Sequence, residues 1–303
     1  MGKPQVGFIF MIVMLFALLA CATSQERART KLSEMNIAYD ENSFVQKAAE
    51  GDTQTVGYFL EAGMDPNVTD RRGNTALIMA AKEGRQEVVK LLLAKGSNIE
   101  GRDTKFKVTP LIWAASKGQN VMVRILLDAG ADPDARESKN GMTAFHVAAV
   151  KGYTKTLKVF VESGEPIDAR DNDGRTPLMW AAYQGHNAAV NFLLDNGADI
   201  DARDAKRGLT ALMTAATRGR TETIQLLLDR GADMNARAND GKTVLILAAF
   251  VGQADTVKFL LENGAHVNDQ DKDGRTALSL AKRYGRWNIV QLLENSGAVE
   301  RGQ

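Results

Sequence analysis

The sequence predicts an all-α repeat solenoid of about eight stacked helix–turn–helix units, including a cap at each end. Two glycine ladders support this prediction, because both recur at steps of 33 or 34 residues along the 303-residue chain. Such a period is typical of repeat architectures, in which each unit buries its apolar face only by stacking on its neighbours. One ladder is Gly51, Gly84, Gly118, Gly152, Gly185, Gly219, Gly252 and Gly285, and the other is Gly63, Gly96, Gly130, Gly164, Gly197, Gly231, Gly264 and Gly297.

The first half of each unit predicts a β-hairpin-like tip followed by a short helix. In the fifth unit Asp171 and Gly174 suit a tight turn, Thr176 suits the N-cap of a helix, and Pro177 falls in its first turn. An alanine pair then follows, whose small side chains allow neighbouring first helices to approach closely. The pairs are Ala80–Ala81, Ala114–Ala115, Ala148–Ala149, Ala181–Ala182, Ala215–Ala216 and Ala248–Ala249. Trp113 and Trp180, each directly before an alanine pair, are expected in the core.

The second half of each unit predicts a leucine-rich helix that stops at a glycine of the second ladder. Residues 224–228 and Gly231 are one example, and a glycine there suits a left-handed helix end. Each predicted helix is too short to be stable alone, so its stability must come from packing. The first unit lacks the usual Thr-Pro-Leu, and the last carries Lys282 and Arg283, as exposed caps should.

The run from Asp171 to Ala182, followed by Gly185, resembles the ankyrin repeat closely. The resemblance extends over residues 41–303 and implies an ankyrin stack. Because ankyrin proteins bind partners across the hairpin tips and the exposed side of the first helices, it also implies a noncovalent protein-binding scaffold or adaptor. The units are expected near 41–69, 70–102, 103–136, 137–170, 171–203, 204–237, 238–270 and 271–303.

The N-terminal residues 1–20 predict a secretory signal. Lys3 precedes an uncharged apolar run, residues 6–20, that would reach only about 23 Å as a helix, short of the roughly 30 Å hydrocarbon core. Residues 18–21, Leu-Leu-Ala-Cys, resemble the lipobox of bacterial lipoproteins. That resemblance implies that Cys21 is lipidated and anchors the chain in a membrane. An ordinary cleaved signal and an uncleaved anchor are the alternatives.

Residues 21–40 are polar and predict a flexible tether between the anchor and the repeats. The expected location is the bacterial cell envelope, with the repeats facing the periplasm. Ala22, where an aspartate would retain an enterobacterial lipoprotein in the inner membrane, slightly favours the outer membrane. A cytoplasmic adaptor held by an uncleaved N-terminal helix remains the alternative.

Composition argues against several function classes. The net charge is +1, from 38 basic and 37 acidic residues, so no nucleic-acid partner is expected. His146, His186 and His266 occupy unrelated positions in three units, and Cys21 is the one cysteine, so no catalytic or metal-binding set can be built from their spacing. His146 is expected to bond the hairpin backbone. We therefore predict no enzyme activity, no cofactor, no metal and no small-molecule substrate.

The candidate partner-binding residues are unusual side chains at normally wetted positions after the alanine pairs. Aromatic residues and arginine are enriched in interfaces, so Tyr183 and Phe250 are expected to centre a binding stripe. The supporting residues are Val150, Val251, Lys151 and Arg218, and Phe106 is a further candidate on a tip without the usual glycine. Two alternatives stay open, that the two rings merely shield the adjacent helix, and that the protein is a structural or targeting anchor without a dedicated client.

The tips at residues 139–141 and 206–208 are basic. They suit an acidic partner or anionic headgroups, or they serve solubility alone.

Overall fold

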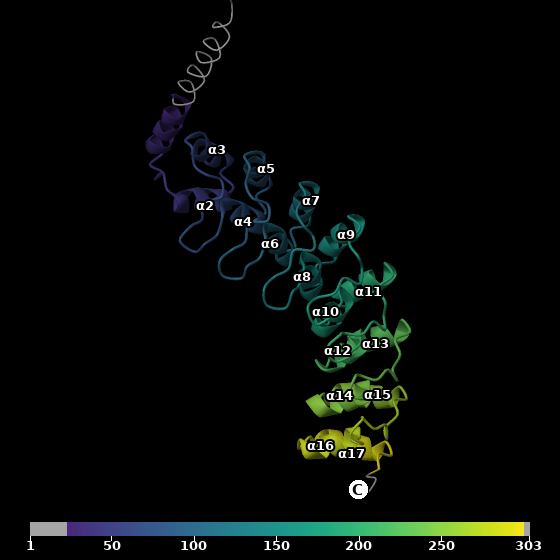
Figure 1. Ribbon diagram of the computed structural model, residues 1–303. Helices are drawn as coiled ribbons and strands as arrows, with labels where there is room; N and C mark the ends of the chain where they lie inside the picture. The colour runs from purple at the N-terminus through teal and green to yellow at the C-terminus, as the bar shows by residue number, and fades with distance from the viewer. Residues whose placement is uncertain (1–22, 300–303) are drawn as a thin grey trace, which may run out of the picture. The chain divides into compact units, whose positions relative to one another are not determined.

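The computed structural model describes residues 23–299 and divides the chain into two compact units, Met1–Asp132 and Pro133–Gln303. Within the described residues, unit 1 holds three helix pairs and unit 2 holds five, which confirms the predicted all-α stack (Figure 1). The expected signal at residues 1–20 and the lipidated Cys21 lie outside the described residues. None of the helices in residues 23–299 combines the length and apolarity needed to cross a bilayer.

The pairs follow one another in chain order. In unit 1 they are α2 (Glu41–Glu50) with α3 (Thr53–Glu61), α4 (Ala76–Lys82) with α5 (Gln86–Ala94), and α6 (Pro110–Ser116) with α7 (Asn120–Asp128). In unit 2 they are α8 (Ala144–Lys151) with α9 (Thr154–Glu162), α10 (Pro177–Gln184) with α11 (Asn187–Asp195), α12 (Ala211–Ala216) with α13 (Thr221–Asp229), α14 (Val244–Val251) with α15 (Ala254–Glu262), and α16 (Ala277–Arg283) with α17 (Trp287–Asn295).

A threonine begins each first helix after α2, as predicted. Thr176 is the N-cap of α10, and its side chain accepts a hydrogen bond from the Met179 amide. Pro177 occupies the first turn, where the missing amide hydrogen costs nothing. Gly185 ends the helix with φ of 83°, a left-handed conformation that glycine adopts without a steric penalty.

The alanine pairs lie where first helices pack on first helices. Ala181 and Ala182 are fully buried in α10, which contacts α8 and α12. Each second helix packs on its own first helix, and Phe160 of α9 meets Phe145 of α8 with their ring centroids 5.6 Å apart. A larger residue in an alanine position would overpack this layer, typically by about 1–3 kcal/mol.

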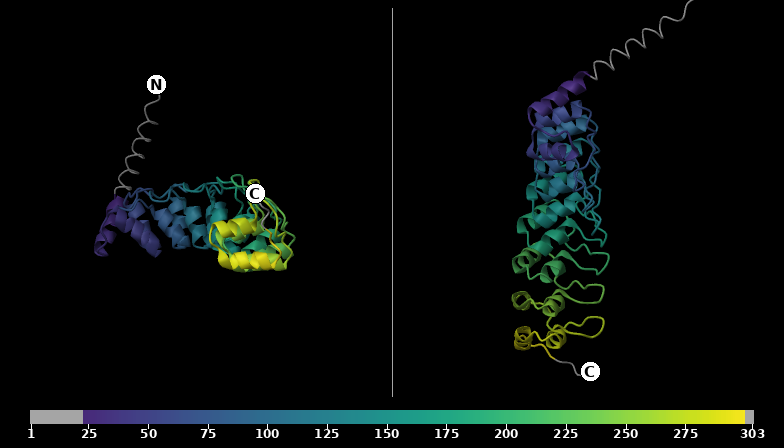
Figure 2. Two further views of the ribbon diagram at one scale, coloured as in Figure 1. Left: turned by 90° about the horizontal axis from the view of Figure 1, so that it is seen from below. Right: turned by 90° about the vertical axis from the view of Figure 1, so that its left-hand side faces the viewer.

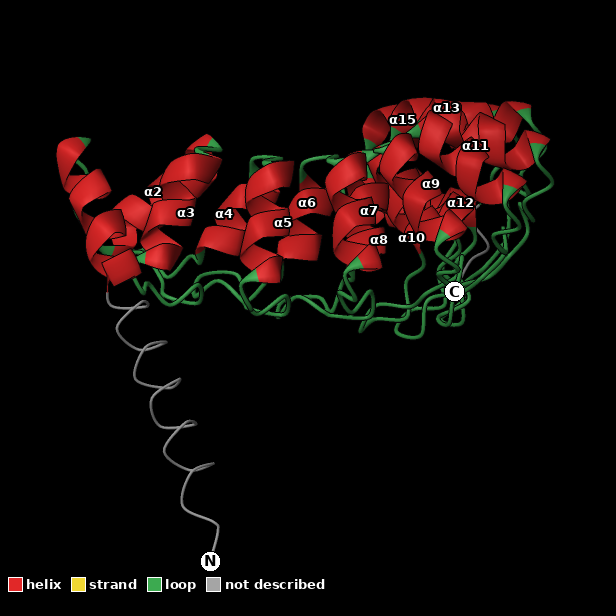
Figure 3. Ribbon diagram, turned by 90° about the horizontal axis from the view of Figure 1, so that it is seen from above, coloured by secondary structure: helices red, strands yellow, loops and turns green. Residues whose placement is uncertain are grey.

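Each pair is joined to the next by a long loop, here called a finger. The fingers project from one side of the helix layers within each unit, as Figures 2 and 3 show. In one finger the Asp171 amide bonds the Arg175 carbonyl at 3.1 Å. Among the described residues, strand-like pairing is limited to two isolated bridges, Thr69–Thr75 and Gln270–Thr276, so the tips are only hairpin-like.

An arginine ladder joins successive fingers of unit 2. Arg170 Nη1 donates to the Gly174 carbonyl of its own finger at 2.8 Å and to the Arg203 carbonyl of the next finger at 2.9 Å. Arg203 donates to the Arg237 carbonyl, and Arg237 donates to the Gln270 carbonyl at 2.8 Å. The fingers that precede α10, α12, α14 and α16 are therefore joined in series through side-chain to backbone hydrogen bonds.

The flexible tether expected at residues 21–40 is wrong for residues 23–34, which are helical. Ala28 and Leu32, four positions apart on one face of this helix, are 3% and 1% exposed. Arg29 Nη2 lies 3.5 Å from the Ala62 carbonyl, and the Tyr39 hydroxyl donates to the same carbonyl at 3.1 Å. The segment packs on the first helix pair because its two apolar residues cover the end of the stack.

Candidate functional site

Tyr183 is held between two side chains of unit 2. Its ring stands edge-on to Trp180, one turn earlier in α10, with the centroids 5.9 Å apart. The Arg218 guanidinium lies 4.8 Å from the centroid of the same ring, a distance that suits a cation–π contact. The structure therefore brings together two of the predicted residues, Tyr183 and Arg218. The Tyr183 side chain is half-buried, so it shields its neighbour in part and remains accessible in part.

Trp180 links the first helix to the finger instead of filling the core as expected. Its Nε1 donates to Asp171 Oδ2 at 3.0 Å, while Asp171 Oδ1 accepts from the backbone amides of Asp173 and Arg175. The indole is half-buried because this bond keeps its nitrogen at the finger side of the helix. Trp113 makes the same contact with Asp103, at 2.9 Å, in unit 1.

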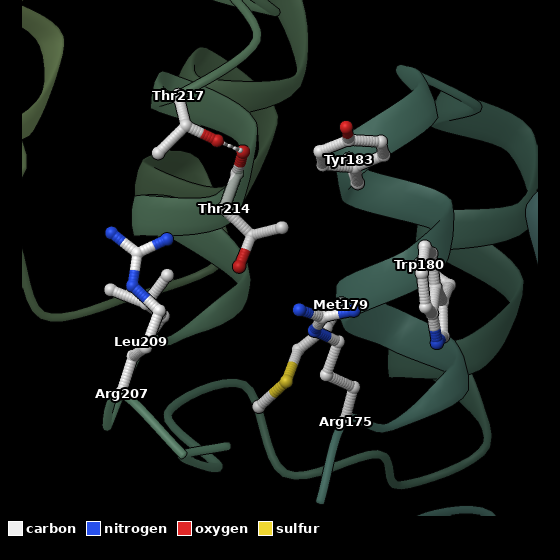
Figure 4. A pocket seen from close by; sticks show the side chains of 8 residues that line it. All are labelled: Arg175, Met179, Trp180, Tyr183, Arg207, Leu209, Thr214 and Thr217. Carbon is white, nitrogen blue, oxygen red and sulfur yellow. Dashed lines mark hydrogen bonds between the residues drawn. The ribbon is translucent and has the colours of Figure 1, made fainter. Parts of the chain in front are cut away.

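A pocket of about 120 Å³ lies between α10, α12 and their fingers (Figure 4). Trp180 and Tyr183 come from α10, Thr214 and Thr217 lie across from them in and just after α12, and two arginines enter from the fingers. The lining residues are Arg175, Met179, Trp180, Tyr183, Arg207, Leu209, Thr214 and Thr217. The pocket thus has aromatic, apolar and cationic walls, and none of its lining residues is acidic.

The two arginines of the pocket differ in their partners. Arg175 packs its guanidinium 5.0 Å from the Trp180 centroid and forms an ion pair with Asp173 at 3.2 Å. Arg207 is exposed, and its side chain has no ion pair or hydrogen bond within residues 23–299. Its backbone is nevertheless fixed, because its amide donates to Asp204 Oδ1 at 2.5 Å and its carbonyl accepts from Asn239 at 2.8 Å.

Phe250 belongs to a second cluster in unit 2. Its half-buried ring stands edge-on to Tyr284, with the centroids 5.0 Å apart, and the Arg283 guanidinium lies 6.0 Å from the Tyr284 ring. Thr217 occupies the equivalent position in the unit between Tyr183 and Phe250, so the predicted stripe consists of two separate aromatic clusters.

The sequence analysis missed Tyr284 and Trp287, which are 48% and 66% exposed. It interpreted the last unit as a polar, charged cap from Ser279, Lys282, Arg283 and Arg286. The sequence does contain a signal for them, because both are aromatic residues at positions where the preceding units carry mostly polar or charged residues.

The remaining predicted residues of unit 2 lie at the C-terminal ends of first helices. Val150 and Lys151 end α8, half-buried and exposed respectively, and Val251 is half-buried at the end of α14. The Val150 carbonyl accepts a hydrogen bond from His186 Nε2 at 3.0 Å, so His186 has a structural role between helix pairs.

Phe106 lies on a finger of unit 1 and is 48% exposed. Its ring stands edge-on to Trp113, with the centroids 5.9 Å apart. The Lys105 ammonium lies 4.9 Å from the Phe106 centroid, and the Lys82 ammonium lies 4.6 Å from the Trp113 centroid. The next residue, Lys107, has φ of 55° where other fingers carry glycine. The finger holds Lys107 in this strained conformation through bonds on either side, from the Phe106 amide to Asp103 Oδ1 and from Arg102 Nη1 to the Lys107 carbonyl.

His146 bonds the finger backbone, as expected. Its Nε2 faces the carbonyls of Ala169 and Arg175 at 3.0 and 3.1 Å, and its Nδ1 lies 2.9 Å from the Thr143 hydroxyl. The Nε2–H tautomer satisfies all of these contacts because the two carbonyls only accept. Burial lowers the pKa of His146 below its ordinary value, so the neutral ring is the stable form.

No cluster of three or more histidine, cysteine, aspartate or glutamate side chains suited to a metal occurs in residues 23–299. The candidate site consists of the aromatic and basic side chains described above.

Comparison with known families agrees with this architecture. A model of ankyrin repeats in three copies matches residues 44–137, 131–204 and 203–271, and a second ankyrin-repeat model matches residues 252–294. The chain is similar to a Treponema pallidum (strain Nichols) protein described as ankyrin repeat-containing, with 33% identity over 73 residues. That alignment covers 24% of each protein. Ankyrin-repeat proteins are in general non-catalytic binders of other proteins. Since the family models cover most of the sequence, this chain belongs to the ankyrin-repeat family.

Proposed function

We propose that the protein is a noncovalent scaffold that binds a partner protein through the first helices and fingers of unit 2. The observation that carries the proposal is the pair of partly accessible aromatic clusters on this surface, Trp180 with Tyr183 and Phe250 with Tyr284. Aromatic anchors with arginine beside them are the side chains that most often dominate the binding energy of an interface. Arg218 supplies that arginine at Tyr183.

The surface is already ordered before a partner arrives. Trp180 is fixed by Asp171, and Tyr183 is fixed by Trp180 and Arg218, so these side chains lose little conformational freedom on binding. Ordering a long side chain at an interface otherwise costs about 0.5–1.5 kcal/mol. A rigid aromatic surface therefore suits specific recognition of a protein.

The test is crosslinking and pull-down from the native cell with the wild-type protein and a Tyr183→Ala, Phe250→Ala double variant. Tyr153→Ala is the matched control, because Tyr153 is an exposed aromatic at the N-cap of α9 in the same unit. We expect the double variant to lose a partner that wild type and control retain. If all three capture the same proteins, the binding surface is wrong, and an anchor without a client becomes the better account.

We further propose that the scaffold is held at a bacterial membrane, facing the periplasm, by lipidated Cys21. The support is residues 18–21, which have the order of a lipobox and contain the one cysteine of the chain. Intact mass of the mature N-terminus, compared between wild type and Cys21→Ser, tests this directly. A cleaved and acylated Cys21 supports the anchor, whereas an intact segment 1–20 would favour a cytoplasmic adaptor held by an uncleaved helix.

A further inference from the structure

The pocket between α10 and α12 has a one-sided charge. Two guanidinium groups, from Arg175 and Arg207, line it, and no carboxylate does. The acidic residues beside the two arginines in the fingers already have partners, and Asp204 Oδ1 accepts from the backbone amides of Arg207 and Gly208. Asp173 pairs with Arg175 at 3.2 Å and Lys206 at 3.4 Å, and Asp171 accepts from Trp180.

The rest of the pocket suits a side chain with a short apolar stem. Met179 and Leu209 are buried at 1% and 6% exposure and form apolar lining, while Trp180 and Tyr183 form an aromatic wall (Figure 4). Thr214 and Thr217 donate their hydroxyl hydrogens to backbone carbonyls, at 2.8 Å each. Within residues 23–299, two lining side chains have donors without a hydrogen-bond or ion-pair partner, the neutral Tyr183 hydroxyl and the Arg207 guanidinium, and Arg207 is the cationic one.

We propose that this pocket receives an acidic side chain, aspartate or glutamate, from an extended segment of the partner protein. The inference rests on the proposed protein-binding function and names the chemistry that the partner presents. Arg207 bonds the incoming carboxylate, Arg175 adds a second cation held in place by Asp173 and Trp180, and the aromatic wall contacts the apolar stem. Bidentate contact between guanidinium and carboxylate gives this recognition its geometry.

A protein segment fits the pocket better than an anionic membrane surface. The pocket is a cavity of about 120 Å³ with an apolar floor, which takes one side chain. A bilayer presents a flat array of headgroups, which a projecting cluster of lysines would contact more readily than a recessed arginine.

The experiment is a selection of short random peptides, displayed on phage, against the full-length protein. Parallel selections use Arg207→Gln and the control Lys258→Gln, which removes one positive charge from exposed Lys258 on α15, the second helix of a different pair. Arg207→Gln is expected to fold, because the exposed Arg207 side chain forms no hydrogen bond or ion pair with any of residues 23–299 and only its backbone bonds the finger. Circular dichroism melting checks this. Vesicles of phosphatidylglycerol are tested against the same three proteins.

We expect peptides selected on wild type and on Lys258→Gln to share an acidic residue at one fixed position. That residue should be absent from peptides selected on Arg207→Gln. For one selected peptide, Arg207→Gln should weaken binding about tenfold or more, and replacing the peptide acid by its amide should cause the same loss. Combining both changes should add little further loss, because each removes the same contact.

Four results would overturn the proposal. Selected peptides without a fixed acidic residue would rule out the proposed role of the pocket, and so would an equal loss of affinity in Lys258→Gln. In either case the proposed protein-binding surface would stand if those peptides still depend on Tyr183 and Phe250. Arg207-dependent binding of vesicles without any acidic peptide would assign the pocket to a membrane. A selection that yields no binding peptide would count against both the pocket and the proposed binding surface.

Discussion

Trp180→Phe should destabilise unit 2 by about 2 kcal/mol, because it removes the hydrogen bond from Nε1 to Asp171. That acceptor is a carboxylate only 6% exposed, and hydrogen bonds to charged groups contribute about 1.5–3 kcal/mol. Phenylalanine keeps the aromatic contact with Tyr183 and loses only part of the apolar area, since Trp180 is half-buried. The hydrogen bond should therefore dominate the loss of stability.

The assay is equilibrium unfolding in urea followed by circular dichroism, which does not depend on the removed fluorophore. Trp287→Phe is the matched control, because Trp287 is 66% exposed and should change the free energy of unfolding by less than about 0.5 kcal/mol. If the two variants lose equal stability, the Trp180–Asp171 bond does not stabilise the finger and this reasoning fails. Asp171→Asn should cost at least as much stability as Trp180→Phe, because its one amide oxygen can accept either from Trp180 Nε1 or from the amides of Asp173 and Arg175, and its NH2 group then faces the other donors.

Three other perturbations test separate features. Lys107→Gly should raise the stability of unit 1 by about 0.5–1 kcal/mol in urea unfolding, because it relieves a left-handed residue at φ 55°, whereas Asn36→Gly should change little since asparagine tolerates its φ of 57°. A loss of stability in Lys107→Gly would refute the strain. The stability of unit 2 should fall as pH drops below about 6.5, because the pKa of His146 is lower in the folded state than in the unfolded chain. The unfolded chain therefore binds a proton that the folded state does not, which favours unfolding. His146→Gln should flatten that slope between about pH 5 and pH 6.5, and an unchanged slope would assign it to other groups. Arg170→Met should speed hydrogen exchange of amides in the finger at residues 171–175, measured by mass spectrometry, and unchanged exchange would show that the ladder does not hold the finger.

Much of the fold follows from local sequence chemistry. Threonine caps, the proline of α10 and the alanine pairs each have one favourable place in a helix stack, so the repeat alone located them. The helix at residues 23–34 was not predicted from the sequence. Its apolar face consists of only Ala28 and Leu32, which are too few to give a helical pattern in a polar segment.

The candidate site was harder to predict. Tyr183 and Arg218 were identified from position, but their contact depends on side-chain directions that spacing does not give. Trp180 was expected in the core because it takes the place of a leucine of the ankyrin pattern. Leucine has no hydrogen-bond donor, whereas the indole nitrogen of Trp180 donates to Asp171. The pocket needs two fingers from different pairs to converge, and no local pattern encodes that approach.

The arginine ladder makes the fingers of unit 2 a mechanically linked series. Because Arg170 bonds both its own finger and the next, a load applied to one tip is shared with the neighbouring tip before either bends. Arg237 extends the same linkage to the finger that contains Gln270. If a partner binds at Arg207 as proposed, it would contact a row of loops joined by hydrogen bonds, and several repeats together would resist force on that partner.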